Sequence, residues 1–229
     1  MSEPDPFVVE MNAALDGLLP LLSIARDSAL QNEALAGLDA LHDRLEAETQ
    51  SAIARHDEFR ANQMLGFKCV LSALGLEIQM WLLLKAEDPE AAWDCLVDAQ
   101  TSALSATRAH PGFAHVEHHF NRLEAIEQLV FPPQVFMSSG LIVGRQACSI
   151  CQADYESCDH VAGRPYWGRF CRIQGHDLQL DHAAIVEHPA DKRCRVVTVP
   201  VEGGHRNKMT WKFEAGEGRT MSTKLLCAG

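Results

Sequence analysis

The sequence lacks several features that would assign it at once to a functional class. Its first residues, MSEPDPFVVEM, have neither the basic start nor the apolar run of a signal peptide. No glycine-rich phosphate loop is recognisable, because EGGH and EAGEG neither join a strand to a helix nor end in Lys-Ser or Lys-Thr. Internal repeats and long low-complexity tracts are absent too, and no Ser/His pair is placed as nucleophile and base. The sequence therefore carries no motif that indicates export, a nucleotide phosphate site or hydrolysis.

Basic residues are scarce. Lys and Arg number 20 against 31 Asp and Glu, for a formal net charge of −11, which argues against broad binding to nucleic acids or anionic membranes. The segment DKRCRV, 191–196, makes only a modest basic patch with Arg206, Lys208 and Lys212, which we interpret as a solvated face. Residues 1–130 hold 21 of the acidic residues and 8 of the basic ones. This change in composition along the chain indicates two regions with different roles.

The most apolar stretch lies in the acidic half. Residues 64–85 are interrupted by Lys68, Glu77 and Gln79, so they predict a central helix buried on most sides rather than a membrane span. We therefore expect a cytoplasmic protein that does not bind a membrane. In a reducing compartment its eight cysteines are expected to bind metal more readily than to form disulfides.

Residues 7–130 have the pattern of helices joined by short links. Over 28–55, leucines recur every three to five positions and form one helical stripe. Asp88 followed by a proline marks the start of a helix over 87–109, and a last helix over 113–130 ends at FPP. The short links indicate four or five helices in an antiparallel bundle.

The pattern changes after Pro133. Short β-branched or alternating runs, such as QVFMSSGLIVGR and CRVVTVPV, are separated by Gly, Pro and Asp and predict strands. We therefore predict an α+β fold, with an acidic helical bundle over residues 1–133 and a small zinc-stabilised β-rich domain over 134–229.

Three cysteines and a histidine lie in the segment CSICQADYESCDH. Cys148 and Cys151 are two residues apart, a spacing that lets both thiolates reach one metal ion from a tight turn. Cys158 and His160 follow and complete the donor set of a tetrahedral Cys3His site. We expect these four residues to hold one structural zinc ion, with Cys171 as the alternative fourth ligand. A thioredoxin-like Cys-x-x-Cys motif and free cysteines are the other interpretations, although polar loop residues rather than a helix follow here.

Extended to CSICQADYESCDHVAGRPYWGRFC, residues 148–171, the segment resembles a known insertion. It is similar to a Cys/His insertion of some phage and prophage proteins, where it lies near the end of a prohead-protease-like β-domain. SSGLIV, 138–143, and HAAIVEHPADKRCRV, 182–196, resemble the strands on either side of it. The resemblance covers about residues 137–196 and implies a metal-binding protein of bacterial or phage origin. It does not imply protease activity, because residues 1–130 look helical where a prohead protease needs its main barrel strands.

Two pairs of histidines outside this cluster are further functional candidates. His115 and His119 are four positions apart on one face of the predicted last helix, a spacing that can chelate a metal. His176 and His182 lie among acidic residues and suit a hydrolase, although the residue order of an HNH-like nuclease is absent. The alternative for both pairs has no functional role. His115 and His119 would then lie on a polar helix face, and His176 and His182 would be exposed strand residues.

We expect a zinc-binding, non-enzymatic interaction or scaffold protein of bacterial or phage origin. A link to mobile elements or phage defence rests on analogy alone. The helical bundle is expected to offer a surface for a protein partner or for self-association. The alternative is a hydrolase, prohead-protease-like or nuclease-like, in which the zinc ion is purely structural.

Overall fold

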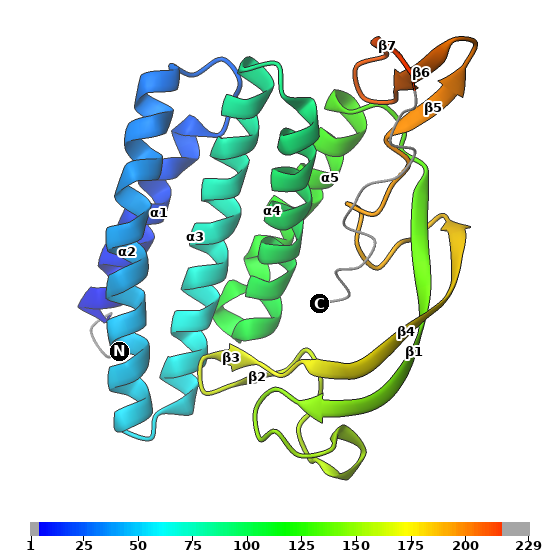
Figure 1. The fold of residues 1–229 in the computed structure, drawn as a ribbon. Helices are drawn as coiled ribbons and strands as arrows, with labels where there is room; N and C mark the ends of the chain where they lie inside the picture. Colours follow the sequence, from blue (N-terminus) through cyan, green and yellow to red (C-terminus); the bar gives the residue numbers. More distant parts are fainter. Residues whose placement is uncertain (1–4, 217–229) are drawn as a thin grey trace. The chain divides into compact units, whose positions relative to one another are not determined.

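The computed structural model describes residues 5–216, with helices first and strands after them (Figure 1). The helices are α1 (Pro6–Leu18), η1 (Leu19–Leu21), α2 (Ser28–Ala54), α3 (Glu58–Lys85), α4 (Pro89–Ala109), η2 (Pro111–Val116), α5 (Glu117–Val130) and η3 (Tyr155–Ser157). The strands are β1 (Phe136–Cys148), β2 (Pro165–Tyr166), β3 (Arg169–Phe170), β4 (Ile173–Val186), β5 (Thr198–Val201), β6 (Gly204–Asn207) and β7 (Phe213–Ala215). The α+β class predicted from the sequence is confirmed.

Aspartates begin the four long N-terminal helices. Their carboxylates accept hydrogen bonds from backbone amides of the first turn, at distances of 2.9, 2.7, 2.9 and 3.1 Å for Asp5, Asp27, Asp57 and Asp88. Each carboxylate satisfies an amide that has no partner within the helix, and its charge also favours the positive end of the helix dipole. The helix start predicted at Asp88 is confirmed.

The described chain divides into two compact units. Unit 1 comprises the residues up to Glu124 together with Gly163–Phe170, and unit 2 comprises Ala125–Ala162 and the residues from Cys171 onward. The short β2–β3 hairpin is therefore part of unit 1, although the chain on both sides of it belongs to unit 2. The boundary between residues 133 and 134, as a limit of independent folding, stays a prediction.

Helix α3 carries the core of unit 1, with α2 and α4 packed beside it (Figure 1). Large side chains that are almost fully buried include Leu45, Met64, Leu71, Ile78, Met80, Trp93, Leu96 and Leu123. By length and composition α3 is the one helix among residues 5–216 that could cross a membrane, but 50% of its most apolar window is buried inside the protein. That burial agrees with the central core helix predicted from its sequence.

Two helical glycines should respond in opposite directions to replacement by alanine. A Cβ atom at Gly66 would meet the ring of Phe113, whereas one at Gly37 would meet nothing within 4 Å. We expect Gly66→Ala to cost about 1–3 kcal/mol of unfolding free energy through overpacking. We expect Gly37→Ala to add about 0.5–1 kcal/mol, because alanine loses less backbone entropy in a helix. Urea unfolding of both variants checks this, and equal stability of the two would contradict the packing at Phe113.

The β2–β3 hairpin binds the helices of unit 1 through its turn. Trp167 and Gly168 have positive φ angles of 50° and 76°. The amide of Trp167 donates to a Glu58 carboxylate oxygen at 3.2 Å, and that of Gly168 donates to Asn62 Oδ1 at 2.9 Å. A Cβ atom at Gly168 would meet Thr49 Cγ2 at 2.7 Å, so the close approach of this turn to α2 favours glycine.

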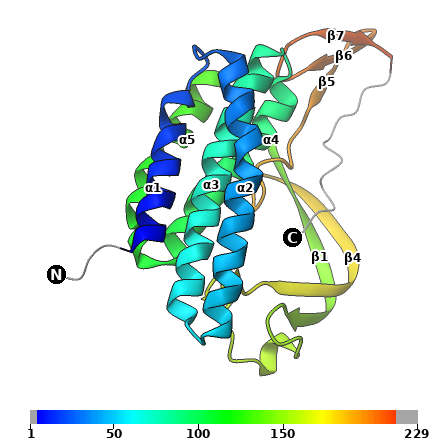
Figure 2. The ribbon, with the colours of Figure 1, turned by 90° about the vertical axis from the view of Figure 1, so that its left-hand side faces the viewer.

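Unit 2 contains a long antiparallel ribbon of β1 and β4, and Figure 2 shows its two strands curving together along their length. The register shifts between Gly140 and Leu141. Gly140 pairs with His182 and Leu141 pairs with Leu180, so Asp181 is an extra residue on β4 with no residue of β1 directly opposite. Such a bulge moves every later side chain of the strand to the other face. Strands β5, β6 and β7 form a separate three-stranded sheet.

The chain around the last predicted helix differs from the expectation. The α-helix begins at Glu117, and the preceding residues Pro111–Val116 form a 3-10 helix. Pro111 and Gly112 break the helical pattern, and the Gly112 amide donates to His110 Nδ1 at 3.0 Å. The prediction that the helix starts at residue 113 is wrong for this reason.

Candidate metal centre

The structure brings together the four side chains predicted to bind zinc. One ligand atom each of Cys148, Cys151, Cys158 and His160 lies within 4.8 Å of all the others. All four belong to unit 2. Thiolate and imidazole groups at this separation form a set that could hold a metal ion.

The first two cysteines are placed by a tight turn at the end of β1. Cys148 is fully buried, its amide donates to Ala153 O at 2.9 Å, and the Gln152 amide donates back to Cys148 O at 2.8 Å. The Ile150 amide points at Cys148 Sγ from 3.4 Å. Gln152 closes the turn with a positive φ of 63°. Local hydrogen bonds therefore set the geometry of the Cys-x2-Cys pair.

The second pair lies after a short 3-10 helix that Asp154 caps, with Asp154 Oδ1 accepting from the Glu156 amide at 3.0 Å. The Cys158 sulfur accepts from the His160 amide at 3.2 Å and lies 3.4 Å from His160 Nδ1. The Ala162 amide donates to the Tyr155 hydroxyl at 2.9 Å, which ties the end of this loop to its beginning.

Two sulfur pairs in the cluster have the same separation. Cys151 Sγ lies 3.7 Å from Cys158 Sγ, and Cys148 Sγ lies 3.7 Å from Cys171 Sγ. Cys171, with 1% of its surface exposed, is as buried as Cys148. Cys171 Sγ is therefore a fifth donor next to Cys148, and Cys171 is the residue predicted as the alternative fourth ligand.

The surroundings of Cys148 favour one thiolate in the cluster. Burial on its own raises the pKa of Cys148, but amide hydrogen bonds from Cys151 and Ile150 and the thiols of Cys158 and Cys171 outweigh it and lower the pKa to about 6. Burial and the neighbouring Cys148 raise the pKa of Cys158 and of Cys171 to about 11 each. One thiolate is therefore available first, and a bound cation would favour deprotonation of the others.

The structure does not bring His176 and His182 together. His176 pairs with Arg145 across the ribbon and His182 pairs with Gly140, so the two histidines lie on opposite faces. Six residues along a regular strand would put them on the same face, but the bulge at Gly140/Leu141 reverses the alternation. His182 Nδ1 lies 3.0 Å from Asp181 Oδ2, and its side chain is 64% exposed. One hydrolytic centre built from both histidines is not supported.

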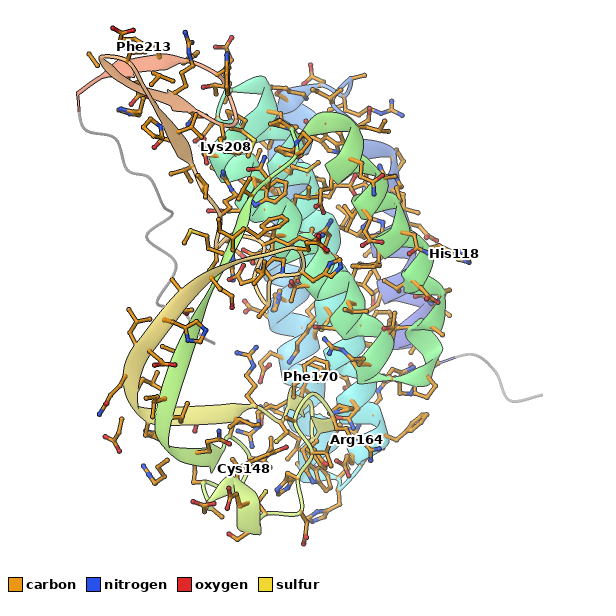
Figure 3. The ribbon with its side chains drawn as sticks, turned by 90° about the vertical axis from the view of Figure 1, so that its right-hand side faces the viewer. His118, Cys148, Arg164, Phe170, Lys208 and Phe213 are labelled. Atoms are coloured by element: carbon orange, nitrogen blue, oxygen red, sulfur yellow. The ribbon has the colours of Figure 1, made fainter. Side chains whose placement is uncertain are left out.

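His115 and His119 do not share a face of one α-helix, because His115 lies in the 3-10 segment. His115 lines a cavity of about 250 Å³ in unit 1 and is the one titratable residue among its lining residues. His119 lies in α5, where its Nε2 approaches Glu77 Oε2 at 3.4 Å. The intervening His118 points outward from α5 (Figure 3). His115 therefore lies in the 3-10 turn before the α-helix that carries His119, and a metal-binding role for the two histidines stays a prediction.

Sequence reasoning missed a buried charged cluster around Glu77. The Glu77 side chain is 0% exposed, and its Oε2 accepts from Arg122 at 2.7 Å. Its Oε1 accepts from Trp81 Nε1 at 3.1 Å, and Arg122 also donates to Leu22 O at 2.9 Å. The signal in the sequence was the single carboxylate in the apolar run 64–85. A buried charge is tolerated when it is paired and hydrogen-bonded, so we interpret this cluster as structural.

Acidification should destabilise unit 1 through His119. Burial, together with Arg122, lowers the pKa of His119 below its ordinary value of 6.5, against the opposing effect of Glu77. The unfolded chain therefore binds the proton more readily than the folded chain does. The contribution of neutral His119 to the free energy of unfolding is complete above pH 6.5 and is lost as the pH falls through the folded pKa. We expect the free energy of unfolding to fall less between about pH 7 and pH 5 in His119→Gln than in the unchanged protein. Urea titrations at both pH values measure this, His118→Gln is the exposed control on the same helix, and equal slopes for all three proteins would contradict it.

The basic residues of unit 2 are partly neutralised. Lys192 pairs with Glu127 at 2.6 Å, and Arg193 pairs with Asp191 at 2.7 Å. Arg206 lies over the ring of Trp211 at 5.8 Å. These side chains therefore have partners within the described residues, and the interpretation of a solvated face stays a prediction.

Comparison of the chain with protein-family models, with curated proteins and with solved structures finds no match.

Proposed function

We propose that this chain is a zinc-binding, non-enzymatic interaction or scaffold protein. The observation that carries the proposal is the convergence of three cysteine sulfurs and one imidazole nitrogen within 4.8 Å. Thiolate and imidazole ligands are the usual donors for structural zinc, whereas magnesium and calcium prefer oxygen. Cys148, Cys151 and Cys158 supply three positions, and His160 or Cys171 supplies the fourth.

A site filled by four protein donors holds the fold and leaves no position for water. Catalytic zinc sites keep such an open position, where the metal lowers the pKa of the bound water. The donors at this site already number at least four. The proposed zinc ion therefore stabilises the loop between β1 and β4.

Metal analysis of freshly purified protein tests the proposal. The protein is produced without added metal, desalted and measured by elemental analysis, and about one zinc ion per chain is expected. A chelator should then remove the zinc ion and make the cluster loop sensitive to proteases, because the metal contributes to folding. Protein that is folded, reduced and free of zinc would contradict the proposal.

We propose that the acidic bundle supplies the interaction surface, for a protein partner or for a second copy. Several large apolar side chains of unit 1 are exposed on its helices and loops: Val9, Leu19, Ile24, Leu30, Phe59 and Leu104. Exposed apolar side chains of this size are typical of contact surfaces when they gather. Sedimentation analysis over a range of concentrations tests self-association. We expect a species heavier than one chain, which Phe59→Ser weakens, and a monomer throughout would contradict self-association.

We also propose a cytoplasmic location and a bacterial or phage origin, with mobile elements or phage defence as the setting. The location is supported by the cluster of reduced thiols that a zinc site requires. The origin is supported by the similarity of residues 148–171 to the phage-type insertion. Neighbouring genes test the origin, and capsid or defence genes are the expected finding.

A further inference from the structure

We infer that Cys171, and not His160, is the fourth metal ligand, so that the site is a zinc tetrathiolate in which His160 donates a hydrogen bond to Cys158. This inference rests on the proposed metal centre and specifies its ligand set. Four ligand atoms lie within 4.8 Å of one another, and Cys171 Sγ is a fifth donor 3.7 Å from Cys148 Sγ, whereas a tetrahedral zinc site has four positions. The geometry of the sulfurs, the position of Cys171 just before β4 and the short spacing of His160 from Cys158 favour Cys171 over His160.

The sulfur separations fit four thiolates around one ion. Two sulfurs bound to zinc at about 2.3 Å in tetrahedral geometry lie about 3.8 Å apart. The Cys148–Cys171 and Cys151–Cys158 pairs are each separated by 3.7 Å. These pairs share no atom, and each has the length of one edge of a zinc tetrathiolate tetrahedron. The sulfurs of Cys148 and Cys158 lie within 4.8 Å of each other, which brings the two pairs together.

Cys171 is held next to the knuckle by strand pairing. Cys148 faces Ile173 across the β1–β4 ribbon. Beyond this pair, the Ser149 amide donates to Arg172 O at 2.9 Å, and the Arg172 amide donates to Ser149 Oγ at 2.8 Å. These bonds place Cys171, the residue before Arg172, next to Cys148. Both sulfurs are buried, at 1% and 0% exposure of their residues, so the Cys171 thiol lies where a buried ligand is required.

His160 is suited to a supporting role. One residue separates it from Cys158, whereas two to four separate the paired cysteines of zinc knuckles. Its Nδ1 lies 3.4 Å from Cys158 Sγ, and its amide lies 3.2 Å from the same atom. A zinc tetrathiolate carries two net negative charges, which N–H groups directed at the sulfurs stabilise. The Ile150 amide plays the same part for Cys148 at 3.4 Å.

Cobalt substitution counts the thiolates. Cobalt(II) replaces zinc in the purified full-length protein, and the intensity of its thiolate-to-metal charge-transfer band is compared between variants. We expect His160→Ala to keep the band of the unchanged protein, and Cys171→Ser to lose about one quarter of its intensity with a shifted ligand-field band. Loss of intensity would follow only from removal of a sulfur ligand.

A measurement on the unchanged zinc protein covers the case in which Cys171→Ser does not fold. X-ray absorption at the zinc edge should show four sulfur neighbours at about 2.3 Å and no nitrogen at about 2.0 Å. Three sulfurs and one nitrogen, or a ligand-field change in His160→Ala alone, would overturn the inference and leave the proposed metal centre intact. Failure of the unchanged protein to bind either zinc or cobalt would instead remove the proposed function itself.

Discussion

Cys148→Ser is expected to lose the metal ion and to unfold the region around the cluster. Cys148 is the buried donor that ends β1. Its sulfur lies 3.7 Å from that of Cys171 and within 4.8 Å of that of Cys158, so its loss removes a ligand shared by both alternative donor sets. Structural zinc sites supply on the order of 10 kcal/mol of apparent binding free energy, which is folding free energy where the unfolded chain has no site. The zinc content per chain and the protease sensitivity of residues 148–171 measure the effect.

Cys194→Ser is the matched control for this experiment. Cys194 belongs to unit 2 but not to the cluster, so its thiol can be replaced without removing a proposed ligand. We expect this variant to keep about one zinc ion per chain. A Cys148→Ser protein that retains a full equivalent of zinc would show that the metal, if bound, lies elsewhere.

The second large effect is expected at the buried ion pair of unit 1, and it should be asymmetric. Arg122→Met leaves the Glu77 carboxylate, which is 0% exposed, without its main partner, and should cost about 3–5 kcal/mol of unfolding free energy. Glu77→Gln leaves an arginine whose side chain is 42% exposed and can turn to water, so about 1–2 kcal/mol is expected. Denaturant unfolding of both variants and of the double variant gives the coupling between the two side chains.

Arg44→Met provides the comparison for the ion pair. Arg44 and Glu10 are joined at 2.6 Å, but their side chains are 43% and 58% exposed, so solvent screens the pair and little change in stability is expected. An equally small loss of unfolding free energy in Arg122→Met and Arg44→Met would show that the Glu77 carboxylate is not buried as the structure has it. His119 can take up a proton when Arg122 is missing, so the loss in Arg122→Met should shrink as the pH is lowered.

The parts of the fold that the sequence predicted correctly depend on short-range interactions. Asp88 with its following proline marked a helix start because a carboxylate there binds amides two or three residues later. The cysteines of the knuckle could be paired from their spacing, because a tight turn brings residues 148 and 151 together. The last helix was misplaced because the competition between a 3-10 and an α-helical start after Pro111 depends on the His110 side chain and the packing of Phe113.

The histidine candidates show how a local pattern fails. His176 and His182 have a spacing that puts two side chains on one face of a regular strand. One extra residue opposite the Gly140/Leu141 step reverses that outcome. Nothing in the residues near Asp181 marks the bulge, because it follows from how β1 and β4 pair along their whole length.

By itself the sequence determined the α+β class, the helix start at Asp88 and a compact group of metal donors, since each depends on residues that are close along the chain. The tertiary structure decided which distant residues meet. It alone placed Cys171 at 3.7 Å from Cys148, Arg122 on the buried carboxylate of Glu77, and the turn of the β2–β3 hairpin on Asn62. These contacts join residues 23, 45 and 106 positions apart. They arise from strand register, helix packing and burial, which no local pattern of residue types encodes.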